Sequence, residues 1–300
     1  MTMATPIDLS QLPVPGVVEL LDFETLYSRR KARLISLFPI EQQSEIAATL
    51  ELESEPMSMI LQENAYVELV LRQRINDAAR AVMLAYAVDG DLDNLVALLG
   101  VKRLVITPAD PDNDIAEVKE SNADLRKRAL LAPLGFSVAG PADSYKSHAL
   151  GADGSVRDVA VKSPEPGRVL VTVLAREGDG TAPQELLDKV GAALNAEAVR
   201  PLTDHVLVQS ASIVPFSIAG ALDYFSGPDR AVVWAEARRR VQAYVEECRQ
   251  IGAIVAISGI DAALHVPGVR RVQLTEPAAD IVTLDSQAPH CIGIDIGPAP

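Results

Sequence analysis

The residues from Ser54 to Gly100 decide the fold of this chain; they read SEPMSMILQENAYVELVLRQRINDAARAVMLAYAVDGDLDNLVALLG. Apolar side chains recur there at steps of three, four or seven, a spacing that keeps them on one side of an α-helix: Met57, Ile60, Val67, Leu71, Ile75, Ala78, Val82 and Tyr86. Since proline is tolerated in a first helical turn, Pro56 marks the predicted start. A helix through Tyr86 would be roughly 50 Å long, more than a compact small domain needs.

The length of this helix predicts that it reaches a partner, with Ile60, Val67, Leu71, Ile75 and Val82 as the interface. It is not a membrane span, because charged residues interrupt it and its charge-free run is far too short to cross a bilayer. Residues 89–94, DGDLDN, then break the helix. Either Asp91 or Asp93 is expected to cap a shorter helix that stops at Gly100.

Composition narrows the classes of partner. The 300 residues are enough for two domains, and the net charge of -14 makes nucleic acid and anionic lipid unfavourable partners. The basic run Arg238–Arg240 is expected on a solvated helix face. Two cysteines, Cys248 and Cys291, and an N-terminus without a secretory layout predict synthesis in a reducing cytoplasm, without disulfides.

Residues 1–100 are predicted to form a helical arm that joins an inter-subunit bundle. Three prolines in Met1–Gly16 favour an extended tail. Asp22 is expected to cap a helix that Pro39 ends, and a third, acidic helix is expected in Glu41–Leu52.

Residues 101–166 are predicted to be a mixed connecting region. Arg103–Thr107 and Ile115–Val118 favour a small hairpin. Two helices are expected next, at Asp124–Leu131 with Ser121 as its cap and at Ala142–Leu150, followed by a strand at Val156–Val161.

Residues 167–300 are predicted to form an α+β self-association module that folds alone. The expected elements follow the order strand, helix, strand, strand, helix, strand: Val169–Ala175, Pro183–Ala196, Asp204–Ala211, Val214–Tyr224, Asp229–Glu247 and Val269–Leu274. That order is typical of a ferredoxin-like fold, two split βαβ units on one antiparallel sheet. A short helix at Ile260–Leu264 and another strand at Cys291–Ile296 are also expected.

The acidic corner after the long helix has part of the pattern of a calcium loop. Such a loop requires glycine at its sixth position and glutamate at its twelfth, where this chain has Asn94 and Gly100. Carboxylates that cap a helix explain the same residues, so no calcium site is predicted.

No other pattern predicts a catalytic, cofactor or metal site. The histidines His148, His205, His265 and His290 fall on different predicted elements, and no serine stands in a GxSxG setting. Gly178-Asp-Gly180 lacks the frame of a phosphate-binding loop and is predicted to be a tight turn. His290-Cys291 lacks any companion ligand cluster and is interpreted as part of a surface tail.

Several short stretches together resemble the baseplate J-like proteins of contractile phage tails and the related R-type tailocins. In the first half these are Leu21–Glu24, Arg30–Leu34, Leu52–Pro56, Glu63–Tyr66, Asn76–Ala85 and Asp91–Asp93. Further on they are Ile106–Asp110, Ser137–Gly140, Val199–Asp204 and Ala263–Val272. Each stretch is chemically bland, so the specificity lies in their number and order.

The resemblance implies a structural wedge protein of a tail or tailocin baseplate, made in the bacterial cytoplasm and then built into the particle. Its implied role is to join wedges into the ring around the tail hub, supporting assembly and the triggering of contraction. Its implied partners are a second copy of itself, an I-type wedge protein, a lysozyme-related wedge component linked to the start of the sheath, and the hub. The alternative is a cytoplasmic enzyme with an unrecognised active site, which would need a converging polar pocket.

Overall fold

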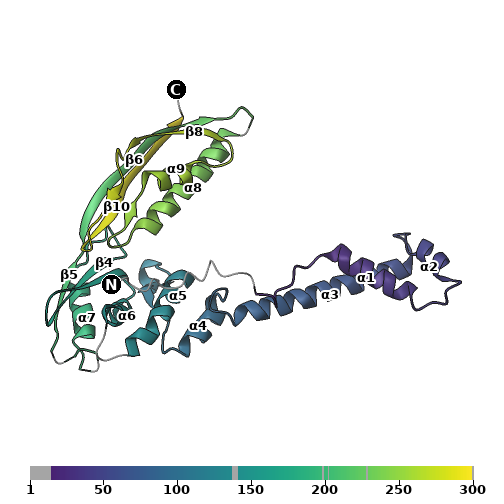
Figure 1. The fold of residues 1–300 in the computed structure, drawn as a ribbon, viewed down its shortest axis with the longest axis horizontal. Coiled ribbons are helices and arrows are strands. Elements are labelled where there is room, and N and C mark those ends of the chain that lie inside the picture. The colour runs from purple at the N-terminus through teal and green to yellow at the C-terminus, as the bar shows by residue number, and fades with distance from the viewer. Residues whose placement is uncertain (1–14, 137–140, 198, 202, 228, 299–300) are drawn as a thin grey trace. The chain divides into compact units, whose positions relative to one another are not determined.

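The computed structural model describes residues 15–136, 141–197, 199–201, 203–227 and 229–298, and the chain divides into two compact units, Met1–Leu98 and Leu99–Pro300 (Figure 1). The predicted mixed α+β class with N-terminal helices is confirmed. Most of the tail predicted for Met1–Gly16, and the stretch Ser137–Gly140, lie outside the described residues.

The first unit is helical, with α1 (Phe23–Ile35), α2 (Gln43–Thr49), α3 (Pro56–Ala81) and α4 (Asp89–Ala97). Helix α1 begins as predicted, since the Asp22 carboxylate accepts the Thr25 N–H at 2.8 Å. Helix α3 has 26 residues and its proline lies in the first turn.

Two expectations for this unit are wrong. Helix α3 does not reach Tyr86; it ends at Ala81, and a turn follows in which the N–H groups of Tyr86 and Ala87 both donate to the Met83 carbonyl. Helix α4 starts at Asp89, so Asp91 lies in its first turn instead of capping it. A carboxylate in the first turn still stabilises the positive end of the helix.

The second unit contains two lobes that follow one another in the chain. We call residues 99–211 the central lobe and residues 212–298 the terminal lobe. The elements of the central lobe are β1 (Val105–Thr107), η2 (Pro111–Asn113), β2 (Val118–Lys119), α5 (Asn122–Leu131), η3 (Ala132–Phe136), α6 (Ala142–Ala152), β3 (Val156–Glu165), β4 (Arg168–Ala175), α7 (Gln184–Leu194) and β5 (His205–Ser210). The predicted hairpin is confirmed as the antiparallel pair β1–β2.

The central lobe is built on a sheet in the order β3-β4-β5. Strand β4 pairs antiparallel with β3 and parallel with β5, and α7 connects the parallel pair. Leu186, Val190 and Leu194 recur every four residues along α7 and are all buried. They pack in one core with side chains of α6 and of the sheet.

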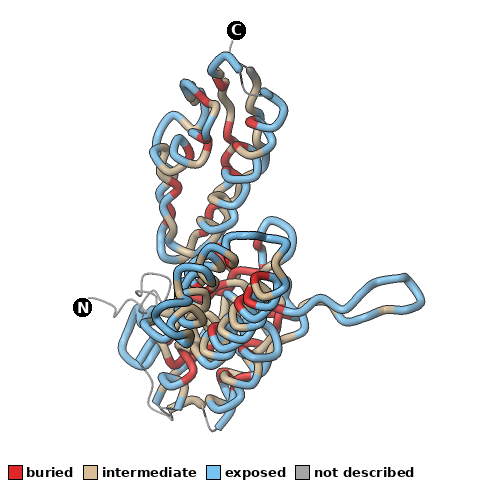
Figure 2. Tube along the Cα trace, turned by 90° about the vertical axis from the view of Figure 1, so that its right-hand side faces the viewer, coloured by how far each residue is buried: buried red, intermediate tan, exposed pale blue. Residues whose placement is uncertain are grey.

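The terminal lobe contains β6 (Ser212–Tyr224), α8 (Arg230–Cys248), β7 (Ile254–Val255), α9 (Ile257–Leu264), β8 (Val269–Glu276), β9 (Ile281–Val282) and β10 (Gln287–Pro298). Its sheet has the order β10-β6-β8, with β10 parallel and β8 antiparallel to β6. Phe216, Ile218 and Leu222 share one face of β6 and pack against buried residues of α8 and α9. Figure 2 shows buried positions alternating with exposed ones along this lobe.

The single ferredoxin-like sheet predicted for residues 167–300 is not formed. Strands β4 and β5 pair with β3, and β6 pairs with β8 and β10, so the predicted strands belong to two sheets. The boundary predicted at Gly167 falls in the turn between β3 and β4, with Glu165 opposite Arg168. The chain passes from one sheet to the next at Ala211, where there is no glycine or proline to signal a border.

Gly220 shows how closely two strands of the terminal lobe approach. A β-carbon at this position would lie 2.5 Å from the carbonyl oxygen of Gln273 on β8. Gly220→Ala is therefore expected to lower the free energy of unfolding by about 1–3 kcal/mol, because the strands must shift to relieve the overlap.

The matched control is Gly293→Ala on β10, where an added β-carbon meets no atom within 4 Å. Urea unfolding of both variants, monitored by tryptophan fluorescence, checks this prediction. Equal midpoints for the two variants would contradict it.

Candidate protein-interaction surface

The candidate site is one face of helix α3, and the packing of the opposite face explains why this one is exposed. That opposite face packs against α1 within the first unit, where Leu61 and Ala65 of α3 and Leu26 of α1 are buried. The Ser58 hydroxyl, also buried, donates to the carbonyl of Leu50 at 3.1 Å. The fully buried residues of α3 are therefore one leucine, Leu61, and three small or polar residues, Ser58, Ala65 and Asn76.

Charged groups continue this packed face toward the end of α3. Glu68 accepts hydrogen bonds from Arg30 at 2.8 Å and from Arg72 at 2.9 Å, and Arg72 reaches Glu19 at 2.6 Å. Hydrogen bonds from Arg30 and then Arg72 lower the pKa of Glu68. Asn76 is buried and makes two bonds to the backbone of Glu19, accepting from its N–H at 3.0 Å and donating to its carbonyl at 2.9 Å.

The five predicted interface residues lie on the other side and are between 46% and 69% exposed: Ile60, Val67, Leu71, Ile75 and Val82. We call this set the outer face of α3. At 100° per residue, the first four lie within about 60° of Ile60 around the helix, whereas Ala65 lies about 140° away. Val82 is the residue at the C-terminal cap. The structure thus brings the predicted residues together along one helix.

Three exposed apolar residues of α3 were missed by the sequence interpretation: Met59, Tyr66 and Val70. They flank the outer face, and a strict helical spacing passes over them. More than half of the exposed large hydrophobic side chains in the described residues lie in residues 15–98, about a third of the chain. Exposed apolar side chains that gather along one helix are typical of protein contacts.

The other sequence patterns that were considered as possible sites can be located in the structure. Within the part of the chain that the structure describes, no group of three or more His, Cys, Asp or Glu side chains could hold a metal ion. Gly178 and Gly180 form the predicted turn, with positive φ at both. None of the described helices is long and apolar enough to cross a membrane.

The interpretation of His290-Cys291 as a surface tail is wrong, because both residues lie in strand β10, paired with Pro215 and Phe216 of β6. Burial raises the pKa of the Cys291 thiol, which keeps it protonated.

The basic run is solvated, as predicted. Arg238 lies over the ring of Trp234 at 5.2 Å, and hydrogen bonds from Arg239 and Arg240 lower the pKa of Glu236 to about 2.

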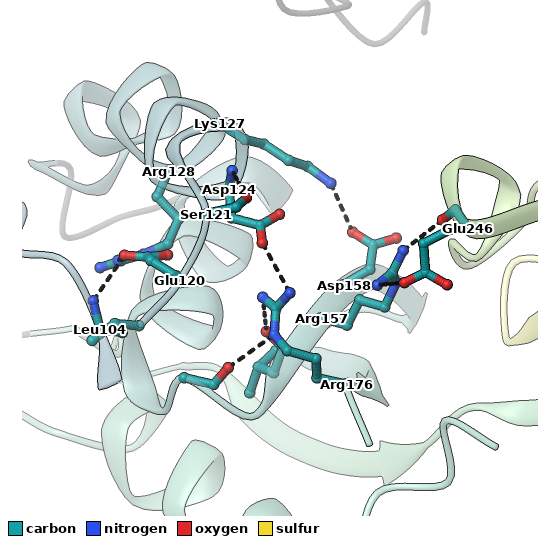
Figure 3. Close-up of polar contacts among 12 residues, drawn as sticks. Leu104, Glu120, Ser121, Asp124, Lys127, Arg128, Arg157, Asp158, Arg176 and Glu246 are labelled. Carbon is teal, nitrogen blue, oxygen red and sulfur yellow. Dashed lines mark hydrogen bonds and ion pairs between the residues drawn. The ribbon is translucent and has the colours of Figure 1, made fainter. Parts of the chain in front are cut away.

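A cluster of charged side chains in the second unit was not predicted (Figure 3). It contains the pairs Glu120–Arg128, Asp124–Arg176 and Arg157–Glu246, and Asp158 beside Lys127 and Lys146. Each charge faces an opposite one, so the cluster is structural in character. The cluster joins residues 120–128 to Lys146, Arg157, Asp158, Arg176 and Glu246, segments that are far apart in the sequence, which is why no local pattern signals it.

Comparison with known proteins assigns the class. Three domain models of one family match the chain: the baseplate J-like N-terminal domain at residues 53–110, the central domain at 137–210 and the C-terminal domain at 214–297. The chain belongs to the baseplate J-like family, a family of baseplate structural proteins. The border between the last two models coincides with the passage from β5 to β6.

One curated relative is similar over nearly the whole length. The chain is 49% identical over 288 residues to baseplate protein J of Escherichia phage P2, covering 95% of each protein. A chain in the cryo-EM structure of the anti-feeding prophage (AFP) baseplate matches at 14% identity with a TM-score of 0.40, over 62% of this chain and 47% of that one.

Proposed function

We propose that this chain is a structural subunit of the baseplate wedge of a contractile tail, where it joins wedges into the ring around the hub. In this proposal the outer face of α3 packs against helices of other baseplate components, first among them an I-type wedge protein. A second copy of the chain, a lysozyme-related wedge component and the hub complete the proposed set of partners. Membership in the baseplate J-like family and the 49% identity to a phage baseplate protein support this role.

The observation that carries the proposal is the arrangement of side chains around α3. Its packed face is satisfied inside the first unit by Glu68, Arg72 and Asn76, whereas its outer face exposes branched apolar side chains. In a helix that served only its own unit, the apolar stripe would face the core. A second amphipathic helix laid along the outer face would bury this stripe, the usual mode of helix-in-groove recognition.

Leu71→Asp is expected to abolish co-purification with the I-type wedge protein, because the substitution places a charge in the middle of the outer face. Leu71 is 59% exposed in the free chain, so the subunit itself should fold normally. Co-expression of the two proteins, followed by affinity purification through the partner, gives the measurement.

The matched control is Gln73→Asp, which adds the same charge two residues away, where the Gln73 amide donates to Asp77 at 2.7 Å on the exposed polar side of the helix. The control should co-purify like the unchanged chain. Survival of the complex with Leu71→Asp would remove the outer face from the interface.

A further inference from the structure

The two lobes of the second unit meet at a small apolar contact. Ala211 connects them in the chain and is buried with Leu174 of β4 and Ala288 of β10. Ile213 and Ile251 pack beside them. Few side chains take part, so this contact alone is a modest restraint on the two lobes.

A bulge in strand β3 directs two consecutive side chains at the other lobe. Between Val156 and Asp158 strand β3 advances two residues, while β4 advances only from Ala175 to Leu174. Arg157 is the extra residue of this bulge. In a regular strand Arg157 and Asp158 would point to opposite faces, but a bulge re-aims the side chains at this point. Figure 3 shows the two side chains next to one another, with Arg157 reaching Glu246.

Arg157 supplies the C-terminal end of helix α8 with hydrogen-bond donors and a positive charge. The last carbonyls of a helix have no partner within it, and a cation near that end is stabilising. The last turn of α8 contains no basic residue. Arg157 donates to the Glu246 carbonyl at 2.6 Å, to the Arg249 carbonyl at 2.9 Å and to the Glu246 carboxylate at 2.5 Å. All three of these acceptors belong to the terminal lobe.

Asp158 connects the lobes through its two carboxylate oxygens. Oδ1 faces Lys146 at 3.2 Å and Lys127 at 3.5 Å, both in the central lobe, and Oδ2 accepts the N–H of Ile251 at 3.1 Å in the terminal lobe. Its side chain is only 5% exposed. Burial by itself raises the pKa of Asp158, but Lys146, Lys127 and the Ile251 N–H outweigh burial, so the pKa lies below its ordinary value and the group stays ionised.

One contact runs in the opposite direction. Arg249, the cap residue of α8, donates to the carbonyl of Gly178 in the turn between β4 and α7 at 2.6 Å. Each lobe therefore donates side-chain hydrogen bonds to backbone carbonyls of the other lobe: Arg157 to the end of α8, and Arg249 to the turn between β4 and α7.

We propose that Arg157 and Asp158 form an interlobe lock, in which a strand bulge of the central lobe terminates helix α8 and makes the two lobes one cooperative body. The inference concerns the second unit alone and does not depend on which partners the chain has.

The test is the unfolding of the full chain in urea, with each lobe followed separately. Trp234, the single tryptophan, lies on α8 and donates to the Ile296 carbonyl at 3.1 Å, so its fluorescence reports the terminal lobe. Pulsed hydrogen exchange with mass spectrometry of peptides from α7 reports the central lobe. In the unchanged chain the two midpoints should coincide, because the lobes unfold together.

Arg157→Met is expected to lower the Trp234 midpoint by roughly 1 M urea while the α7 midpoint changes less, which separates the two transitions. The matched control is Arg176→Met, since Arg176 bonds within the central lobe, to the Gly154 carbonyl at 3.2 Å, the Val156 carbonyl at 3.5 Å and the Asp124 carboxylate at 2.9 Å. The control should lower both midpoints together.

Arg157→Lys serves as a second variant if the methionine variant does not fold; it keeps the charge but loses the planar fork, and an intermediate separation is expected. Coincident midpoints in both Arg157 variants would overturn the proposal, because the coupling would then rest on the remaining contacts between the lobes: the apolar contact around Leu174, the hydrogen bonds Asp158–Ile251 and Arg249–Gly178, and the ion pair Lys162–Asp285. Separate midpoints in the unchanged chain would overturn it as well.

Discussion

In a fragment that begins at Gly167, residues 167–211 are expected to lack cooperative unfolding, whereas residues 99–300 should unfold in one sharp transition. The shorter fragment loses β3, which pairs antiparallel along β4 from Val156 to Glu165. It also loses α6, whose Tyr145, Ala149 and Leu150 are buried in the same core as Val171 and Val173. Much of the central core would be exposed, at about 25 cal/mol per Å² of apolar surface, so the remaining sheet is not expected to hold.

Thermal unfolding of the two fragments, followed by circular dichroism and calorimetry, gives the measurement. The terminal lobe can retain its structure in both fragments. A third fragment, residues 212–300, therefore measures how much of the circular dichroism and calorimetric signal comes from this lobe. A single cooperative transition for the Gly167 fragment, with an enthalpy in proportion to its length, would contradict this expectation.

A large loss of stability is also expected when the buried ion pair between Glu120 and Arg128 is broken. The Glu120 side chain is only 2% exposed and also accepts the N–H of Leu104 at 2.9 Å, while Arg128 is 14% exposed and donates to the Lys102 carbonyl at 3.1 Å. Arg128→Leu would leave the buried carboxylate without this cation. The expected loss is about 3–5 kcal/mol in the free energy of unfolding, because a buried charge without a partner is costly.

Urea unfolding, monitored by hydrogen exchange of peptides from α7, measures this loss of stability in the central lobe. The matched control is Arg239→Leu, which removes an exposed partner of Glu236 and should leave the midpoint unchanged, since solvent screens exposed pairs. Equal effects of the two substitutions would contradict the expected cost of removing the cation beside Glu120.

Three helix starts could be predicted because capping is local chemistry. Asp22, Ser121 and Asp229 each stand before a helix, and the side chain of each accepts a backbone N–H in the first turn. The end of α3 could not be predicted, since no glycine, proline or capping residue stands near Ala81 and the apolar spacing continues past it. Periodicity identifies the face of a helix better than its last residue.

The division of the strands between two sheets could not be predicted from their order. Strand β6 pairs with β10, whose first residue comes more than sixty residues after the end of β6. Alternating apolar residues predict a strand but do not specify its neighbour. For the same reason the interlobe lock was missed, because Arg157 and Glu246 are 89 residues apart.

The exposed apolar face of α3 could be predicted from the sequence, but the reason for its exposure could not. The sequence interpretation relied on the length of α3. In the structure the decisive feature is Asn76, a buried amide whose bonds to Glu19 hold the opposite face inside the unit. Polar residues inside a helical stripe do not stand out when apolar residues alone are followed.

The two-sided character of α3 has a consequence for the life of the subunit before assembly. The polar side of α3 already has its hydrogen-bond partners within the first unit, so the helix is expected to stay folded when its partner protein is missing. Its exposed apolar face then remains free to associate with other molecules. Copies made in excess of their partners should therefore accumulate as native-like clusters instead of unfolded chains. The net charge of -14 opposes such clustering by mutual repulsion, and raising the salt concentration would weaken that protection. Matched synthesis of this subunit and its baseplate partners is thus expected to matter for solubility as well as for stoichiometry.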